Sequence, residues 1–305
     1  MPKPDFYLIG ALKSGTSAMA SFLGQHPGLY VPVKDVCFFG SDLEFRRTLQ
    51  RTGDWFQPTE ERYLEFFDDP AAGARIGEAT AYYLHSALAA REIEAFSPGA
   101  SIIAMLRNPV DMVHSMHKHW LFSLNEDVTD LAEALALEKE RGSGRCIPET
   151  AFWPRGLQYR SIACYTDQLE RYFEVFGRDR VHVILFDDFR SDIRNTYRRT
   201  LEFLGASTNF EPPFEVKNPS KQVRSRRLQQ FLLNPPEWIQ AVARPILENP
   251  RLRRGIGGLA RKLNTQVAHS LGMTPELRAE LTEYFRPEVE RLGRLLERDL
   301  SAWIR

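Results

Sequence analysis

The chain has 305 residues, and its content of 43% hydrophobic and 26% charged residues is that of a folded globular protein, which excludes a disordered chain. Lysine plus arginine and aspartate plus glutamate both number 40, so no overall positive field exists to attract nucleic acid, and any anion site has to be local. The three cysteines are widely spaced without a CxxC pair, which argues against a zinc or redox motif and favours a reducing compartment.

The sequence contains no segment with the pattern of a membrane span or a secretion signal. Nowhere do about 18 apolar residues follow one another, which is the length that a membrane-spanning helix needs. The apolar run at residues 6–9 is too short for the core of a signal peptide. We therefore expect a cytoplasmic protein with neither a membrane span nor a nucleic-acid partner.

Two strand-to-helix units are predicted in the first third of the chain. The apolar run 6–9 ends at a Gly/Ser/Thr loop, and residues 18–26 after it have the pattern of a helix. Residues 101–106 form a second apolar run, after which Pro109 stands in the first turn of a helix. Each unit thus consists of a buried strand, a loop and a helix.

A third unit follows further along the chain. Residues 157–176 have apolar side chains at helical spacing, which predicts one long amphipathic helix, and 181–186 then form a strand. Ser191 or Asp192 caps a further helix that closes at Gly205. Strands separated by helices predict an α/β fold with a central parallel sheet and a helical layer on each face.

The carboxyl-terminal third of the chain is predicted to be mainly helical and loop-rich. Residues 212–272 are rich in Asn, Pro, Arg and Gly and lack a strong period, which indicates loops and short helices lying over the core. Thr274 caps a final helix with Pro275 in its first turn, running toward Trp303.

The segment GALKSGTS at residues 10–17 has the frame of a phosphate-binding loop. Its two glycines let backbone N–H groups turn inward, and the helix behind adds its positive dipole end. In a nucleotide triphosphatase a lysine would follow the second glycine directly, but Thr16 stands there and the lysine is Lys13. The loop is therefore P-loop-like without the signature of ATP or GTP hydrolysis. An isolated turn of this kind can also merely join a strand to a helix.

A second anion site is predicted at the loop after residues 101–106. Arg107 leaves the strand tip, and Ser115 lies about two helical turns further on. A guanidinium and a hydroxyl make a natural cradle for a phosphate. Because right-handed crossovers bring both loops to the carboxyl edge of the sheet, the two sites suit a nucleotide phosphorylated at both ends of its ribose.

At these residues the chain resembles the sulfotransferases that use 3′-phosphoadenosine 5′-phosphosulfate (PAPS), particularly the branch with heparan sulfate sulfotransferases and bacterial carbohydrate and natural-product enzymes. That family has a K-x-G-T loop for the 5′-phosphosulfate, and R-[DN]-P followed by a Ser eight residues after the Arg for the 3′-phosphate. Five residues match these motifs position for position: Lys13, Gly15, Thr16, Arg107 and Ser115. Residues 26–39 are similar to the family's HP…K-E-x-x-FF stretch and 76–84 to its GE-x-[ST]-x-x-Y segment.

The resemblance implies one sulfotransferase domain over 1–305, direct in-line transfer from PAPS to an acceptor hydroxyl, and no metal. Residues 212–272 would cover the donor and acceptor site, with Arg227 and 261–264 near the adenosine unless they form a solvated charge run. Lys13 would stabilise the leaving bridging oxygen. Eight residues are expected to bind the donor: Lys13, Ser14, Gly15, Thr16, Ser17, Arg107, Ser115 and Arg227.

The acceptor hydroxyl must lose its proton, so a base within hydrogen-bond reach is required. Asp35 stands where the family commonly has Glu and is the first candidate, although it could equally cap a turn. The reserve candidates are Glu78, His85, His117 and His119. A metal site formed by the histidines is not expected, because His119 lies off the helix face that His117 shares with its neighbour His114.

Two departures from the family pattern concern the acceptor. Cys37 stands where heparan-type members often carry His, and Ala79 where they often carry Lys, which implies a different acceptor with less positive charge around it. Aromatic residues in 54–67 and 151–159 either line an acceptor groove or belong to the core. We expect a hydroxylated small molecule or glycan, and the neutral chain favours a small or weakly charged one.

Two other classes of function stay open at this point. A P-loop kinase or nucleotide triphosphatase needs a metal-holding aspartate after a buried strand, and Asp187 or Asp188 is compatible with that role. A non-catalytic nucleotide-binding protein would hold the bisphosphate without turnover.

Overall fold

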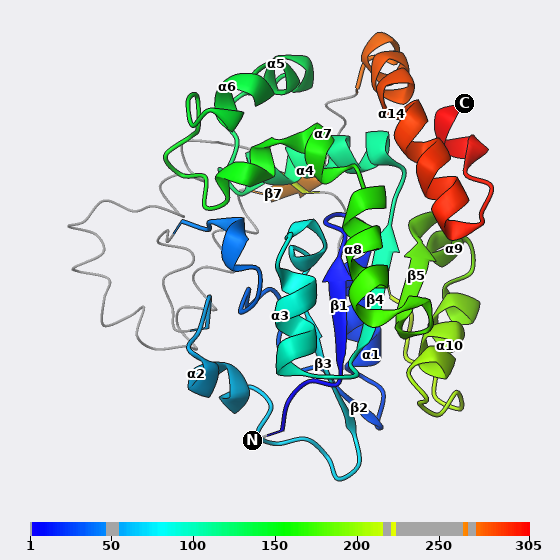
Figure 1. Cartoon of the computed structure of the whole chain (residues 1–305). Helices are drawn as coiled ribbons and strands as arrows, with labels where there is room; N and C mark the ends of the chain where they lie inside the picture. The colour runs from blue at the N-terminus through cyan, green and yellow to red at the C-terminus, as the bar shows by residue number, and fades with distance from the viewer. Residues whose placement is uncertain (1, 47–54, 216–220, 224–264, 268–272) are drawn as a thin grey trace.

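The structure, a computed structural model, describes residues 2–46, 55–215, 221–223, 265–267 and 273–305. Its centre is a five-stranded, all-parallel sheet in the order β2-β3-β1-β4-β5 (Figure 1). The strands are β1 (Phe6–Gly10), β2 (Leu29–Tyr30), β3 (Arg75–Ala79), β4 (Ser101–Leu106) and β5 (Val181–Leu185). The predicted parallel sheet is confirmed, and β2 and β3 are additions to the three predicted strands.

Helices cover both faces of the sheet. Alternate residues of each strand point to opposite faces, so each strand packs against both helical layers. Phe6 and Leu8 pack in one apolar cluster, whereas Tyr7 and Ile9 pack in another. The first cluster includes α1 (Thr16–Leu23), α9 (Phe186–Ser191) and α10 (Ile193–Phe203); the second includes α3 (Ala89–Phe96), α4 (Pro109–Phe122), α8 (Thr166–Phe176) and α14 (Pro275–Leu296). The predicted three-layer arrangement is therefore confirmed.

The prediction of one long helix over 157–176 is wrong. The chain instead forms a 3₁₀ turn at Pro154–Leu157, then α7 (Tyr159–Ile162), and only then α8. The apolar spacing survives across the interruption because Leu157, Ile162 and Leu169 are all buried. Periodicity alone does not reveal such a break.

Side chains cap the starts of three helices, two of them at residues predicted from the sequence. Asn108 begins α4, with its side-chain oxygen accepting from the N–H groups of Val110 (2.9 Å) and Asp111 (3.4 Å). Asp192 caps α10 and Thr274 caps α14. Within the predicted loop-rich region, β6 (Lys221–Val223) and β7 (Thr265–Val267) pair antiparallel, and β6 lies against α4.

A fully buried ion pair anchors the segment between α4 and α7. This segment carries the short helices α5 (Leu131–Ala136) and α6 (Glu138–Gly142). Two guanidinium nitrogens of Arg141 each donate to the Glu126 carboxylate at 2.7 Å, and neither side chain is exposed. The Tyr159 hydroxyl donates to the same carboxylate at 2.8 Å. The carboxylate is thus well satisfied despite its burial, as a buried charge must be.

The carboxyl-terminal residues pack onto the strand ends. The Trp303 indole donates to Asp187 at 2.7 Å, and the Asn108 side chain donates to the Trp303 carbonyl at 3.1 Å. Arg298 pairs with Asp188 at 2.9 Å. Across the described parts of the chain, no helix is both long and apolar enough to cross a membrane.

Candidate active site

The loop between β1 and α1 folds as a left-handed turn that opens the helix. Lys13 has φ 60° and Gly15, the residue before the helix, has φ 92°. A β-carbon on Gly15 would stand 3.1 Å from the Phe186 ring and 3.2 Å from Met105, so glycine is required on both conformational and steric grounds. The first N–H groups of a helix have no partner within it, and here they add positive potential at the loop.

The predicted loop residues differ in how much of their side chains is available. Ser17 is exposed and Thr16 is buried. The hydroxyl of Ser14 is buried and donates to the Leu12 carbonyl at 3.2 Å, so it serves the loop itself. Ser14 therefore has only its backbone to offer a ligand in this arrangement.

The second predicted anion loop meets the first. Arg107 follows β4, which pairs with β1, and its guanidinium donates to the Lys13 carbonyl at 3.3 Å. The same guanidinium lies 4.9 Å from the centroid of the Phe186 ring. Ser115 is partly exposed on α4, the helix that starts two residues after Arg107. The expectation that both loops lie at one edge of the sheet is confirmed.

Three cations gather at this edge. Burial lowers the pKa of Lys13 below its usual value, and the nearby positive charges of Arg107 and Lys34 lower it further. Such mutual repulsion is relieved when an anion binds among the three groups. Lys34 was missed from the sequence, although it is the lysine of the K-E-x-x-FF-like stretch and could have been noticed there.

Asp35 is held at the end of β3, next to the cation cluster. Its N–H donates to the Ala79 carbonyl at 2.7 Å, and the Ala81 N–H donates to its carboxylate at 3.2 Å. Lys34 pairs with the same carboxylate at 2.7 Å, and the Asp35 side chain is 28% exposed. A carboxylate that is oriented on one side and open on the other is suited to accept a proton.

The reserve base candidates lie in less suitable places. Glu78 is buried, with its carboxylate accepting from the Tyr63 hydroxyl at 3.1 Å and from Thr80. Burial raises the pKa of Glu78 to about 7. Its side chain faces protein groups rather than an acceptor.

The three candidate histidines differ in their surroundings. Burial lowers the pKa of His85 to about 4, so its ring is neutral, and it contacts the Trp153 ring edge-to-face at 5.7 Å. His117 is buried with Nε2 bonded to the Val128 carbonyl at 2.9 Å, and burial lowers its pKa as well. His119 is partly exposed on α4, with its ring against Trp120.

The two aromatic segments that the sequence left open are mostly core. From 54–67, Phe56, Tyr63 and Phe67 are buried, and from 151–159 so are Phe152 and Trp153. Tyr82 is the residue after Ala81, whose N–H donates to Asp35. The Tyr82 ring packs edge-to-face on Trp153 at 5.1 Å and on the half-buried Phe45 at 5.3 Å. Of these three aromatic side chains, only Phe45 is partly exposed.

Asp187 and Asp188, the pair that a kinase would need for its metal, are engaged elsewhere. As described above, Asp187 accepts from the Trp303 indole and Asp188 pairs with Arg298, both in the carboxyl-terminal segment. Their role in the structure is to fix that segment to α9, which follows β5 directly. Arg227 and 261–264, predicted near the adenosine, lie outside the described residues.

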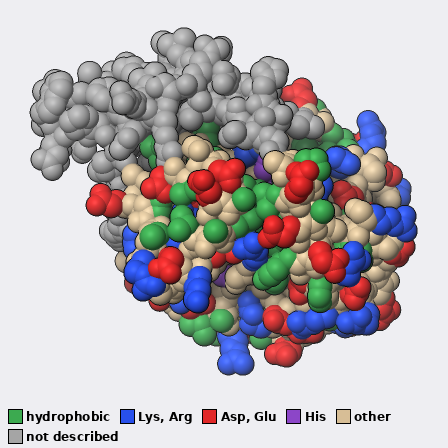
Figure 2. Space-filling view, turned by 90° about the horizontal axis from the view of Figure 1, so that it is seen from above, with side chains coloured by type: hydrophobic (Ala, Val, Ile, Leu, Met, Phe, Trp, Pro, Cys, Tyr) green, Lys and Arg blue, Asp and Glu red, His purple; other side chains and the backbone are tan. Residues whose placement is uncertain are grey.

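Figure 2 looks onto the carboxyl ends of the strands. The described surface in this view mixes acidic, basic and hydrophobic side chains, without a large patch of one charge. This agrees with the balanced composition. A ligand anion at this edge would thus be held by the local cluster of Lys13, Lys34 and Arg107.

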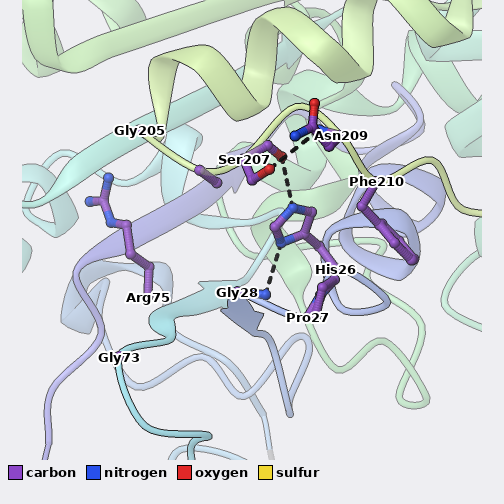
Figure 3. A pocket seen from close by; sticks show the side chains of 10 residues that line it. His26, Pro27, Gly28, Gly73, Arg75, Gly205, Ser207, Asn209 and Phe210 are labelled. Carbon is purple, nitrogen blue, oxygen red and sulfur yellow. Dashed lines mark hydrogen bonds between the residues drawn. The ribbon is translucent and has the colours of Figure 1, made fainter.

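A cavity of about 410 Å³ lies at the opposite edge of the sheet (Figure 3). His26 is fixed there, because its Nδ1 accepts from the Gly28 N–H at 3.0 Å and Nε2 therefore donates to the Ser207 carbonyl at 2.9 Å. Arg75 is held by Asp5 at 2.7 Å. Ligands of parallel α/β sheets bind at the carboxyl edge, so this cavity is not the active site.

Comparison with known proteins gives one consistent result. The sulfotransferase domain family matches residues 3–293. The crystal structure of a sulfotransferase from Alicyclobacillus acidocaldarius superposes with a TM-score of 0.73 at 31% identity, covering 100% of both chains.

Curated relatives point the same way. The bifunctional heparan sulfate N-deacetylase/N-sulfotransferase 1 of Xenopus laevis is 27% identical over 208 residues, which are 67% of this chain and 22% of that protein. The corresponding enzyme 4 of Mus musculus is 25% identical over 314 residues, 99% of this chain and 31% of that protein. The chain thus spans less than a third of the length of these relatives.

Proposed function

The chain belongs to the sulfotransferase family, and from its site geometry we propose that it moves the sulfuryl group of PAPS to a hydroxyl of a glycan or small-molecule acceptor. The observation that carries this proposal is the hydrogen bond between Arg107 and the Lys13 carbonyl, which joins the two anion loops. A donor with phosphates at both ends of its ribose would be held by the two loops together. The crowded cations around Lys13 fit such a polyanion.

In the proposed reaction the acceptor oxygen forms a bond to sulfur while the bond from sulfur to the bridging oxygen of the 5′-phosphate breaks. The acceptor proton passes to the Asp35 carboxylate, and adenosine 3′,5′-bisphosphate leaves. Lys13 stabilises the negative charge that develops on the bridging oxygen, as positioned cations do in related phosphoryl transfer. Lys34 pairs with the Asp35 carboxylate at 2.7 Å and thereby orients it.

The acceptor class follows from the groups around the Asp35 loop. Tyr82 is buried, but Phe45, which packs on it, is half-buried and offers aromatic surface to a ring. Among the described residues, Lys34 is the only cation that pairs with Asp35. Ala79 and Cys37, both buried, add no positive charge. We therefore favour a weakly charged sugar or small ring compound over a highly sulfated polysaccharide.

Ligand-dependent thermal stability tests the donor part of the proposal. Adenosine 3′,5′-bisphosphate should stabilise the protein more than AMP or ATP, because only that ligand fills both anion loops. Equal shifts from AMP would contradict the two-loop site. Arg107→Ala should remove most of the difference between the two ligands.

A matched control for Arg107 is available at the other edge of the sheet. Arg178 lies 4.7 Å from the Phe173 ring centroid and donates to the Leu295 carbonyl at 2.9 Å, so it makes the same kinds of contact. Arg178→Ala should leave the ligand shifts unchanged. If both arginine variants weaken the shifts equally, Arg107 acts only on stability.

Turnover tests the chemical roles. With radiolabelled PAPS and a panel of glycans and phenols, Lys13→Ala and Asp35→Ala should each lower kcat by roughly 10²-fold or more, the usual contribution of one acid–base or electrostatic group. Near-normal turnover of Asp35→Ala would move the base to one of the reserve candidates, of which His119 is partly exposed on α4.

A further inference from the structure

Glu78 is a buried carboxyl group to which the proposed chemistry gives no task. It is the last residue but one of β3 and 1% exposed. The next residue, Ala79, carries the carbonyl that receives the Asp35 N–H. Glu78 thus lies one peptide unit from the point where the proposed base is attached to the sheet.

The Glu78 carboxylate gathers hydroxyl groups from separate parts of the chain. Tyr63 of α2 (Glu60–Glu65) donates at 3.1 Å, Thr80 donates to the other oxygen, and the Tyr83 hydroxyl is a third partner. A buried carboxylate with several donors fixes each of them in place, because losing one leaves an unsatisfied buried charge.

Tyr83 extends this network to the loop that carries Asp35. Its hydroxyl oxygen accepts the backbone N–H of Phe38 at 3.0 Å and of Phe39 at 3.3 Å. With both N–H groups donating to it, the hydroxyl has its own proton left to donate, and Glu78 is a side-chain partner. The Tyr83 hydroxyl therefore connects Glu78 to the residues just after Asp35.

The loop needs such a restraint. Asp35 has φ 57° and Cys37 has φ 54°, and each residue other than glycine in this left-handed region costs about 1 kcal/mol. A loop with two such residues relaxes unless the surrounding structure holds it. The bonds to Tyr83 are attached directly after the strained pair.

We propose that Glu78 is a positioning residue that fixes the Asp35 loop through the Tyr83 hydroxyl and the backbone of Phe38 and Phe39. The inference rests on the proposed role of Asp35 as base. It explains why a carboxyl group remains in a site without any cation bonded to it among the described residues.

The ionisation of Glu78 then affects the loop. The groups that face it are the hydroxyls of Tyr7, Tyr63, Tyr83 and Tyr172, the Thr80 hydroxyl and the Asp35 carboxylate, with Cys37 beside Tyr83. When Glu78 takes up a proton, one carboxyl oxygen becomes a donor and the negative charge is lost, so the hydrogen bonds that its partners donate to it weaken. Turnover should therefore show a step in the neutral range.

Two tyrosine variants separate the proposed path from a general effect on the core. Tyr83→Phe removes the hydroxyl that binds the loop backbone, whereas Tyr63→Phe removes only a donor to Glu78 and keeps the ring that stacks on Phe38 at 4.0 Å. We expect Glu78→Gln and Tyr83→Phe to lower kcat roughly 10-fold or more with the KM for PAPS nearly unchanged, and Tyr63→Phe to change kcat by about twofold at most. The kcat of Glu78→Gln should also lose its step in the neutral range.

Amide hydrogen exchange of residues 35–39 supplies a readout that does not depend on turnover. Exchange should speed up in Glu78→Gln and Tyr83→Phe but not in Tyr63→Phe. Unchanged exchange in the first two variants, or equal effects of the two tyrosine variants, would overturn the inference. Faster exchange together with a wild type that transfers no sulfuryl group would instead overturn the proposed function and leave the structural link intact.

Discussion

The buried Glu78 carboxyl makes the stability of the protein depend on pH in a predictable direction. Burial raises the pKa of Glu78 from 4.5 to about 7, because the charged form loses its water. A raised folded-state pKa means that the contribution to stability is fully present below pH 4.5, and that it is lost as the pH rises through 7. Glu78→Gln, which does not titrate, removes this dependence.

The size of the effect follows from the shift. At 1.36 kcal/mol per unit, the free energy of unfolding of the wild type should fall by about 2 to 3 kcal/mol relative to Glu78→Gln between about pH 5 and pH 8. Urea denaturation followed by tryptophan fluorescence at several pH values measures this difference, provided that the m-values of the two proteins agree. A difference that stays flat across the range would show that Glu78 ionises normally in the folded protein and would refute the reasoning.

Further predictions concern the ion pair and the anion loop. Arg141→Met should lower the free energy of unfolding by about 3 to 5 kcal/mol, because Glu126 stays buried without its partner, and the double change with Glu126→Leu should recover much of the loss in urea denaturation. Gly15→Ala should weaken binding of adenosine 3′,5′-bisphosphate by about 10-fold or more in calorimetry, since the added carbon meets Phe186 in a left-handed backbone. Trp303→Phe, which loses the indole bond to Asp187, should cost about 1 kcal/mol in thermal unfolding.

The sequence predicted the parts of the fold that depend on local signals. The apolar runs of β1, β4 and β5, each followed by a helix, are sufficient to indicate a parallel sheet, and Asp192 and Thr274 mark the starts of two helices. β2 has two residues, and β3 contains a glycine and a buried glutamate. Neither strand has the apolar run that identifies a buried strand, so both were overlooked.

The same distinction applies to the candidate site. Lys13 and Arg107 stand in motifs with a physical reason for their spacing, and the structure brings them into contact. The places of Phe186 beneath Arg107 and of Glu78 behind Asp35 depend on tertiary packing between distant segments. No periodicity or motif encodes which tyrosines will surround a carboxyl group, so the network around Glu78 could be found only in three dimensions.

The gathering of Lys13, Lys34 and Arg107 has a practical consequence for solution work. Lys13, together with the two positive charges that lower its pKa, forms a general binding site for small oxyanions, whatever their identity. Phosphate or sulfate in a purification buffer would compete for the loop, and donor affinities measured there would be too low. Crystals grown from ammonium sulfate should carry an ion at this position, which would mark the site before any nucleotide is added.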